Sequence, residues 1–320
     1  MILITGINGE LGSALTKKIS QFKSEKIIGF DLSEPNENIK NLLYKTYKGD
    51  IRDSSLIKKI FSENRIDTIY HLAAILSTEA EKKPYLSHSV NVEGFFNIIN
   101  SINVKNVKFF FPSSIAVYHL NNHNKNIKIT ENDFCNPNNI YGCNKLYCEK
   151  LGSYFQNSQN AEFNIDFRSI RFSGIISAHS LPQGGTSDYA PEMIHNAIQK
   201  KDYTCFVRKD SCIPFIVMPD AVNAIIKLMR INKVNLTTDV YHIQSFSPTV
   251  EQIYEKLISY FPEFKLNYKV DENRQKMVDS WPSQLNQQKA INDWGWKPEF
   301  NFDNAFEKYL IPKISEYYNK

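Results

Sequence analysis

The chain has 320 residues, of which 42% are apolar and 22% are charged, as in ordinary globular proteins. A net charge of +4, with basic residues spread along the chain, argues against a nucleic-acid-binding protein. No window approaches the ~20 apolar residues of a membrane span, and Met1 runs directly into an apolar segment without a secretory signal. The five cysteines are scattered and the histidines lack metal-binding spacing, so we expect reduced thiols, a cytoplasmic location and no metal.

The first predicted strand, residues 2–4, runs into a glycine-rich turn. Gly6, Gly9 and Gly12 are followed by apolar residues at helical spacing. Such glycines let the backbone approach a pyrophosphate, and the helix N-terminus offers N–H groups to an anion. Asp31 ends the next apolar run about 20 residues later, where an acidic residue accepts hydrogen bonds from the adenosine ribose. A carboxylate there would repel a 2′-phosphate, so the pattern favours NAD over NADP.

Alternating strands and helices continue along the chain. Asp50 follows a third predicted strand, where it either meets the adenine or is a plain turn residue. Asp53 is a predicted N-cap for a helix over 54–63. Residues 68–74 are predicted to form a buried parallel strand, whose small last residues would let a flat cofactor lie close to the backbone.

Two serines at the ends of strands are candidate substrate contacts. Ser77 follows the strand over 68–74 in a loop, ahead of a long helix predicted from about 79 to 103. Ser114 ends the next predicted strand, where ligands bind in open α/β sheets. The Ser114 hydroxyl either donates to a reacting oxygen or caps a turn, and local sequence favours the two readings about equally.

A polar, Asn-rich loop over 121–139 leads into a predicted helix that carries Tyr141 and Lys145. Residues four apart lie on one face of a helix, so the phenol and the ammonium can enter one pocket. A cation beside the phenol is expected to lower its pKa from ~10 and make it a base for an alcohol proton. Tyr-x-x-x-Lys alone is a weak signal, and its position after a dinucleotide motif and Ser114 gives it weight.

The alternation of strands and helices predicts a Rossmann-type, doubly wound parallel sheet, with a sixth strand over 165–171. After Gly174 the chain contains a turn-rich loop, helices near 191–200 and 219–229, and then short helices with one strand near 266. We expect an NAD-binding domain from residues 1–172 with 216–243. Residues 173–215 with 244–320 are expected to form a smaller C-terminal α/β substrate-binding lobe.

With the glycine turn, Ser114, Tyr141 and Lys145 in this order, the chain resembles the epimerase-like, extended short-chain dehydrogenase/reductases. Residues 172–178, 182–189, 279–282 and 293–297 narrow the resemblance to the L-threonine 3-dehydrogenases of this type. The resemblance implies NAD-dependent oxidation of the L-threonine β-hydroxyl to 2-amino-3-oxobutyrate. It also implies a homodimer built from the long helices that begin near 79 and 138.

The same resemblance assigns roles to individual residues. Tyr141 would be the base, Lys145 would orient the nicotinamide ribose and lower the pKa of Tyr141, and Ser114 would polarise the alcohol. The residues expected to bind the cofactor are Gly6, Asn8, Gly9, Leu11, Gly12, Asp31, Asp50, Ile51, Leu72, Ala73, Ala74, Asn91, Tyr141 and Lys145. The residues expected to bind the substrate are Ser77, Ser114, Tyr141, Gly185, Thr186 and Trp281.

The sequence departs from the family pattern at several positions. Ser173 occupies a position where the family usually has proline, and Gln183 replaces a glycine. Ser187 replaces a threonine, and Asn286–Gln287 occupy the place of a common acidic pair. The first two departures are expected to loosen loop closure and lower turnover without changing the reaction type.

Two other functions fit part of the pattern. A nucleotide-sugar epimerase or dehydratase would hold NAD tightly, but residues 174–194 offer no Lys or Arg to a substrate pyrophosphate. A non-catalytic NAD-binding protein would not need Tyr141, Lys145 and Ser114 together.

Overall fold

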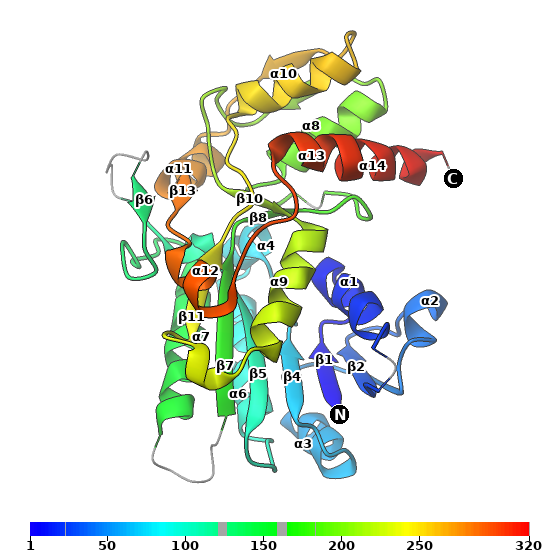
Figure 1. Ribbon diagram of the computed structural model, residues 1–320, viewed down its shortest axis with the longest axis vertical. Helices are drawn as coiled ribbons and strands as arrows, with labels where there is room; N and C mark the ends of the chain where they lie inside the picture. The colour runs from blue at the N-terminus through cyan, green and yellow to red at the C-terminus, as the bar shows by residue number, and fades with distance from the viewer. Residues whose placement is uncertain (23, 121–126, 159–164, 183, 320) are drawn as a thin grey trace. The chain divides into compact units, whose positions relative to one another are not determined.

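The computed structural model describes residues 1–320 except 23, 121–126, 159–164, 183 and 320 (Figure 1). The chain divides into two compact units. The first unit comprises Met1–Val117, Pro137–Arg171 and Val222–Tyr241. The second unit comprises Tyr118–Asn136, Phe172–Ala221 and His242–Lys320. Residues 118–136, which we had expected in the NAD-binding domain, cluster with the second unit.

A seven-stranded parallel sheet, flanked by helices, forms the core of the first unit. In spatial order its strands are β11 (Val240–Ile243), β7 (Ile165–Phe172), β5 (Val107–Ser114), β4 (Thr68–His71), β1 (Ile2–Thr5), β2 (Ile27–Asp31) and β3 (Lys45–Lys48). The chain starts in the middle of the sheet and winds out to both sides, which confirms the doubly wound fold. The parallel strands end at one common edge, where β1 meets the glycine turn and β5 ends at Ser114.

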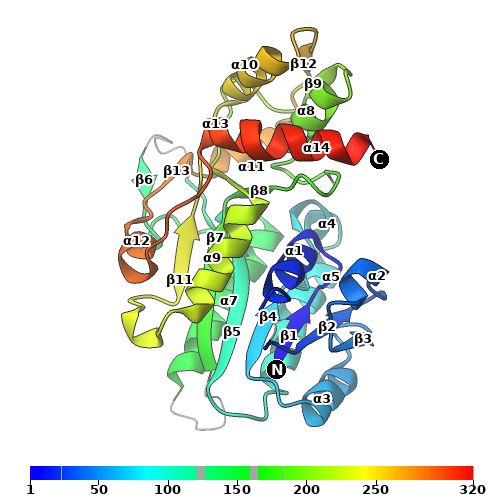
Figure 2. The ribbon, with the colours of Figure 1, turned by 45° about the vertical axis from the view of Figure 1, so that its right-hand side comes forward.

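Helices cover both faces of this sheet. The helices of the first unit are α1 (Glu10–Ile19), α2 (Glu37–Lys40), α3 (Ser54–Glu63), α4 (Ser77–Lys82), α5 (Pro84–His88), a π-helical turn (Ser89–Glu93), α6 (Gly94–Ile99), 3-10 turns at Ile115–Val117 and Lys233–Asn235, α7 (Ile140–Asn157) and most of α9 (Met218–Arg230). Phe109 and Phe111 face α3, α6 and α7 in one core cluster. On the opposite face α1 and α9 lie side by side (Figure 2), and the Arg230 guanidinium is 3.8 Å from the Phe22 ring.

Local sequence explains where two of these helices begin and end. α3 begins at Ser54 as predicted, because the Asp53 carboxylate accepts the N–H groups of Ser55 and Leu56 at 3.0 Å. The single helix predicted over 79–103 is wrong. The segment is helical from Ser77, is interrupted at Lys83 (φ −133°, ψ 65°) and ends at Ile99. The interruption arises because Pro84 disfavours the helical conformation at the residue before it.

The second unit contains short strands that pair outside the central sheet. Its elements are β6 (Lys128–Ile129), β8 (Gly174–Ile176), α8 (Tyr189–Ile198), β9 (Tyr203–Cys205), β10 (Phe215–Val217), α10 (Val250–Tyr260), β12 (Leu266–Tyr268), α11 (Glu272–Ser280), β13 (Gln284–Leu285), α12 (Gln288–Trp294), α13 (Phe302–Ala305), a π-helical turn (Phe306–Leu310) and α14 (Ile311–Tyr318). Each pair, β8 with β10, β9 with β12 and β6 with β13, is parallel. The strand predicted near 266 is confirmed, whereas the others, two or three residues long, were too short to predict.

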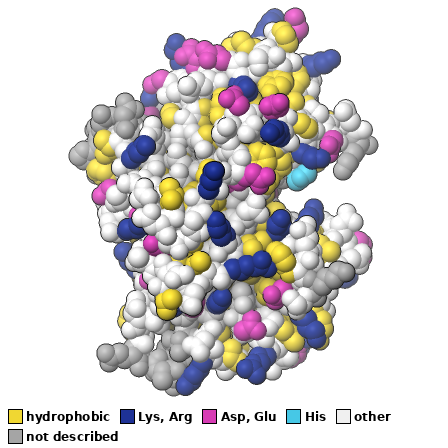
Figure 3. Space-filling view, viewed as in Figure 1, with side chains coloured by type: hydrophobic (Ala, Val, Ile, Leu, Met, Phe, Trp, Pro, Cys, Tyr) yellow, Lys and Arg dark blue, Asp and Glu magenta, His cyan; other side chains and the backbone are white. Residues whose placement is uncertain are grey.

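Charged side chains of both signs are interspersed on the face of the molecule that Figure 3 shows. Among the described residues, no helix has both the length and the apolar character needed to cross a membrane. The same residues contain no group of three or more His, Cys, Asp or Glu side chains arranged to hold a metal ion.

Candidate active site

The glycine turn after β1 brings three segments of backbone into close contact. Gly6 adopts φ +70°, and its amide donates to the Phe30 carbonyl at 2.9 Å. A Cβ on Gly6 would lie 2.7 Å from the Ala73 nitrogen, and a Cβ on Gly12 would lie 2.2 Å from the Gly6 carbonyl oxygen. The start of α1 and the loop after β4 therefore approach the turn as closely as backbone allows. This is the geometry that a dinucleotide phosphate site needs at a helix N-terminus, with Gly9 as N-cap and Leu11 in the first turn.

Asp31 ends β2 beside this turn. Its Oδ2 accepts the backbone N–H of Asn8 at 2.9 Å. The Asn8 side-chain amide donates to the carbonyl and the hydroxyl of Ser33, each at 2.9 Å. Asn8 thus ties the glycine turn to the end of β2 and fixes the carboxylate at the edge of the sheet. The residues present here fit the adenosine end of NAD.

Asp50 forms a tight local pair with Arg52. Its carboxylate accepts the Arg52 backbone N–H at 2.9 Å and the guanidinium at 2.6–3.1 Å. The hydrogen bond from the Arg52 side chain lowers the pKa of Asp50. Ile51 is buried, and its carbonyl accepts from Asn97 at 3.0 Å. The described contacts of Asp50 are those of a turn aspartate, and its contact with adenine stays a prediction.

Asn91 organises the loop after β4. Its Oδ1 accepts the Ile75 N–H at 2.8 Å, and its Nδ2 donates to the Ile75 carbonyl at 3.0 Å and to the Ser87 hydroxyl at 3.2 Å. The Thr5 hydroxyl accepts the Ala73 N–H at 3.2 Å from the other side. These bonds hold the partly buried residues Leu72 to Ile75, and the contact of Asn91 with the cofactor stays a prediction. Ser77 follows as the first residue of α4.

The beginning of α7 packs against the turn that follows Ser114. The Asn139 side chain caps α7 by accepting the Gly142 N–H at 2.7 Å, and it donates to the Ala116 carbonyl at 3.3 Å. A Cβ on Gly142 would lie only 2.1 Å from that carbonyl oxygen. Glycine at 142 therefore lets α7 approach Ser114 closely, next to Tyr141.

Lys145 lies one helical turn after Tyr141, on the same face of α7. Its Nζ donates to the Pro112 carbonyl at 2.7 Å, lies 4.5 Å from the centre of the Phe111 ring and 5.5 Å from that of Tyr141. Ser114, half-buried, accepts the Ala116 N–H at 3.1 Å, so the turn-capping reading holds. Because that bond uses the oxygen as acceptor, it leaves the hydroxyl hydrogen able to donate to another group.

The pKa shifts of Tyr141 and Lys145 differ from those that the sequence predicts. Burial lowers the pKa of Lys145 to about 8, and burial raises the pKa of Tyr141. The predicted lowering of the Tyr141 pKa by Lys145 is therefore wrong for the protein by itself. The ammonium lies over the ring and bonds to Pro112, so it does not offset the loss of solvation of a phenolate.

The predicted substrate residues of the second unit gather around α11. The Gly185 N–H donates to Asp188 at 2.7 Å, and the Thr186 hydroxyl donates weakly to the Met277 sulfur at 3.7 Å. Arg274 donates to the Gly184 carbonyl at 3.0 Å and stacks on Phe206. Trp281 directly follows α11, is 5% exposed, and its indole N–H has no partner among the described residues. α11 thus supports three predicted substrate residues within one unit.

The departures from the family pattern have different surroundings. The Ser173 hydroxyl is buried without a partner among the described residues. Gln183 lies outside the described residues, and Ser187 lies close to Gly174. Gln287 accepts the Gln244 backbone N–H at 2.8 Å and the Trp296 indole N–H at 2.6 Å, so this amide has a structural role.

Two buried charged residues next to the candidate site were not predicted from the sequence. Glu149 and Arg171 form a buried ion pair in which the guanidinium and the carboxylate approach to 2.6 Å. Both are charged residues at positions where the helix and strand patterns call for apolar side chains. That mismatch is the signal that could have identified them.

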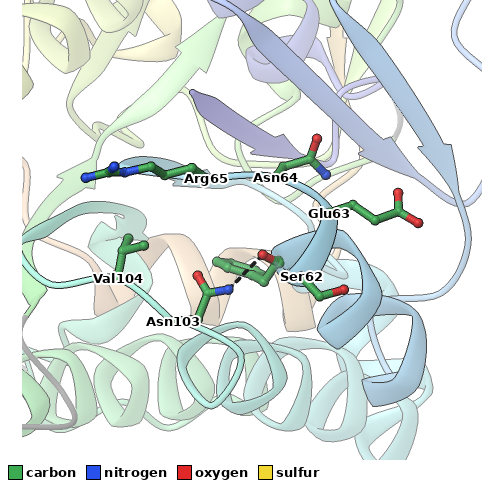
Figure 4. Close-up of a pocket in the computed structure, with 7 residues that line it drawn as sticks. Ser62, Glu63, Asn64, Arg65, Asn103 and Val104 are labelled. Carbon is green, nitrogen blue, oxygen red and sulfur yellow. Dashed lines mark hydrogen bonds between the residues drawn. The ribbon is translucent and has the colours of Figure 1, made fainter.

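A separate pocket of about 310 Å³ lies at the other edge of the sheet (Figure 4). Its lining is Phe61 to Arg65 with Asn103 and Val104, residues that precede β4 and β5. The Asn103 amide donates to the Phe61 carbonyl at 2.8 Å, and the Asn64 amide donates to the Tyr47 hydroxyl and the Ile60 carbonyl. Because these amides bond within the protein, we assign this pocket no ligand.

Comparison with known proteins shows the family to which this chain belongs. Residues 2–243 match the NAD dependent epimerase/dehydratase family. The chain therefore belongs to this family, and it is an oxidoreductase-type enzyme with NAD as its cofactor.

Individual relatives cover nearly the whole chain. An uncharacterized epimerase/dehydratase of Staphylococcus saprophyticus is 32% identical over 98% of this chain and 96% of its own. The mitochondrial L-threonine 3-dehydrogenase of Bos taurus is 31% identical over 94% of this chain and 79% of its own. The solved structure of a monomeric L-threonine 3-dehydrogenase from a metagenome is 35% identical, with a TM-score of 0.89 over 99% of both chains.

Proposed function

We propose that this enzyme oxidises the β-hydroxyl of L-threonine to 2-amino-3-oxobutyrate and transfers the hydride to NAD. The observation that carries the proposal is the likeness to an L-threonine 3-dehydrogenase over 99% of both chains, which includes the second unit. A likeness confined to the first unit would support only the binding of NAD. The substrate is proposed to be a small amino acid, which fits a site built from hydroxyl, indole and glycine groups.

Tyr141 and Ser114 would handle the proton of the alcohol. The Ser114 hydroxyl donates to the substrate oxygen and holds it near the phenol. Tyr141 accepts the alcohol proton as the C–H bond at the β-carbon breaks. When bound, NAD would supply the hydride acceptor, and the positive charge of its oxidised nicotinamide ring would favour ionisation of a neighbouring phenol. Lys145 would hold the nicotinamide ribose and supply a second positive charge near the phenol.

Other predicted residues would bind the two reactants. Gly6, Gly9 and Gly12 would let the backbone approach the pyrophosphate of NAD. Asp31 would accept hydrogen bonds from the hydroxyls of the adenosine ribose. Ser77, Gly185, Thr186 and Trp281 would bind the amino-acid part of threonine. The indole N–H of Trp281, which lacks a partner among the described residues, is a donor available to a carboxylate.

A spectrophotometric assay of NADH formation tests the proposal directly. Purified protein is supplied with NAD and, separately, with L-threonine, L-serine, allo-threonine and UDP-galactose. We expect NADH with L-threonine at the highest kcat/KM. The absence of NADH with all three amino acids, together with conversion of UDP-galactose, would instead identify a sugar-nucleotide epimerase.

Replacing Asp31 tests cofactor choice. In Asp31→Asn the hydrogen bond from Asn8 can be retained, but the charge that repels a 2′-phosphate is lost. Repulsion between unit charges near a protein surface is worth ~1–4 kcal/mol, so the ratio of kcat/KM for NAD to that for NADP should fall about tenfold or more. The control is Glu34→Gln, an exposed carboxylate three residues later, for which the ratio should not change. An unchanged ratio in Asp31→Asn would refute the role of Asp31.

Replacing Thr186 tests the substrate site in the second unit. Thr186→Ala removes a buried hydroxyl whose only described bond is a weak one to Met277. The KM for threonine should rise about tenfold while the KM for NAD stays within a factor of two, since a lost hydrogen bond costs ~1 kcal/mol or more. Thr204→Ala, on an exposed position of β9, is the control. If the KM for threonine did not move, Thr186 would lie outside the substrate site.

The quaternary structure and the location of the protein stay predictions. Tyr85 on α5 and Tyr147 and Tyr154 on α7 are 91%, 48% and 64% exposed. These aromatic side chains on the helices expected at the interface support the proposed homodimer, whereas one structural relative is described as monomeric. The proposed location is the cytoplasm.

A further inference from the structure

A buried network of Glu149, Arg171 and Ser113 lies next to Lys145 and Ser114 in the fold. Glu149 is 1% exposed and Arg171, on β7, is 3% exposed. The guanidinium donates from Nε to Glu149 Oε1 at 2.8 Å and from a terminal nitrogen to Oε2 at 2.6 Å. The hydroxyl of Ser113 donates to the same Oε1. One carboxylate thus joins α7, β7 and the end of β5.

The network fixes the strand that carries Ser114. Pro112 accepts from Lys145 at 2.7 Å, and the next residue, Ser113, donates to Glu149. Tyr141, Lys145 and Glu149 follow one another at intervals of four on α7, so they share one face of the helix. Two successive residues of β5 are therefore fastened to two successive turns of α7. The position of the Ser114 hydroxyl relative to the Tyr141 hydroxyl depends on both attachments.

Glu149 also contributes to the charge on Lys145. Burial is the largest influence on the pKa of Lys145 and lowers it, while Cys148 and Glu149 raise it. His71 on β4 faces the same region, and burial lowers its pKa to about 3, so it is neutral at physiological pH. Tyr141 is protonated because burial raises its pKa. From β5 the ammonium meets only the Phe111 ring and the Pro112 carbonyl among the described contacts, and Arg171 on β7 adds positive charge.

We propose that Glu149, oriented by Arg171, is a positioning residue of the active site. It fixes the end of β5 against α7, and it places a carboxylate one helical turn from Lys145 on the same face of α7. The catalytic consequence rests on the proposed function, whereas the protonation of Lys145 can be measured without turnover.

The test compares two carboxylate-to-amide variants that each face an arginine of β7. Glu149→Gln alters the network, and the control Asp166→Asn alters the pair of Asp166 with Arg168, which lie five and three residues before Arg171 on β7. The protonation of Lys145 is followed by NMR titration of isotope-labelled lysine Cε signals, assigned with Lys145→Met. Removal of a nearby anion disfavours the cation, so the Lys145 midpoint should fall by ~1 pH unit in Glu149→Gln. It should not change in Asp166→Asn.

Turnover and NAD binding supply the second readout. In Glu149→Gln the alkaline limb of kcat/KM for threonine should move to lower pH with the Lys145 midpoint, and kcat should fall ~10–100-fold. The affinity for NAD should weaken above the new midpoint and stay normal below it. An unchanged Lys145 midpoint in folded Glu149→Gln overturns the proposal. A shifted midpoint in a protein that does not oxidise threonine supports the role of Glu149 and rejects the proposed substrate instead.

Two further variants separate folding from positioning. Glu149→Gln leaves Arg171 buried without a full counter-charge, so the double variant Glu149→Gln with Arg171→Met removes both charges and is tested if the single variant does not fold. Because this double variant also removes the positive charge of Arg171, the Lys145 midpoint should fall by less than in Glu149→Gln. A Lys145 midpoint that does not fall would overturn the charge role. Ser113→Ala leaves the ion pair intact and removes only one of the two attachments of β5 to α7. It should lower kcat without changing the KM for NAD, and an unchanged kcat would overturn the attachment role.

Discussion

Tyr141→Phe should lower kcat by ~10²–10⁴ with little change in the affinity for NAD. The substitution removes only the phenolic oxygen and keeps the ring beside which Lys145 lies at 5.5 Å. Since α7 is capped by Asn139 and packed through Gly142, neither of which the change touches, the helix should keep its position. The loss in turnover therefore measures the proton transfer itself.

A matched control for this experiment lies on the same helix. Tyr147 is 48% exposed on α7, and Tyr147→Phe removes an identical hydroxyl away from the site. Its kcat and NAD affinity should equal those of the parent protein. Near-parental turnover in Tyr141→Phe, measured as NADH formation with threonine, would exclude Tyr141 as the base.

Gly12→Ala should weaken the binding of NAD by about 100-fold or more. The added Cβ would lie 2.2 Å from the Gly6 carbonyl oxygen and 2.9 Å from the Ile7 Cα, both backbone atoms that cannot rotate away. Either α1 or the turn must move by about 1 Å, and a displacement of this size in a binding site can cost ~10² in rate or affinity. Isothermal titration with NAD measures the effect without any assumption about the substrate.

Gly9→Ala provides a graded comparison in the same turn. A Cβ on Gly9 would be 3.2 Å from the Gly6 carbonyl oxygen, a contact that a small shift relieves. Its affinity for NAD should therefore fall much less than that of Gly12→Ala. Equal affinities for Gly12→Ala and the parent protein would show that the approach of α1 to the turn does not define the site.

Local signals in the sequence predicted much of the fold. The alternation of apolar runs and amphipathic segments gave the order of strands and helices, and Asp53 marked the start of α3 because its carboxylate caps that helix. The break at Lys83 follows from Pro84 and was readable in the same way. β11 was not predicted, because its four residues form a strand only when β7 offers them an edge for pairing.

The candidate site was predictable only in part. Helical spacing placed Tyr141 and Lys145 on one face, and the structure brings them together. Spacing carries no information on solvation, so the direction of the Tyr141 pKa was missed. The pairing of Glu149 with Arg171 joins residues 22 positions apart on different elements, and only the packed structure reveals it.

The strand order has a consequence for how the protein is made. β5 lies next to β7 and β7 next to β11, yet β7 begins at Ile165 and β11 at Val240. A ribosome that releases the amino-terminal segments first leaves the growing sheet with an open edge, at β5 and then at β7, until the later strands emerge. Such distant pairing slows folding, so nascent chains of this enzyme should depend on chaperones to keep that edge from aggregating.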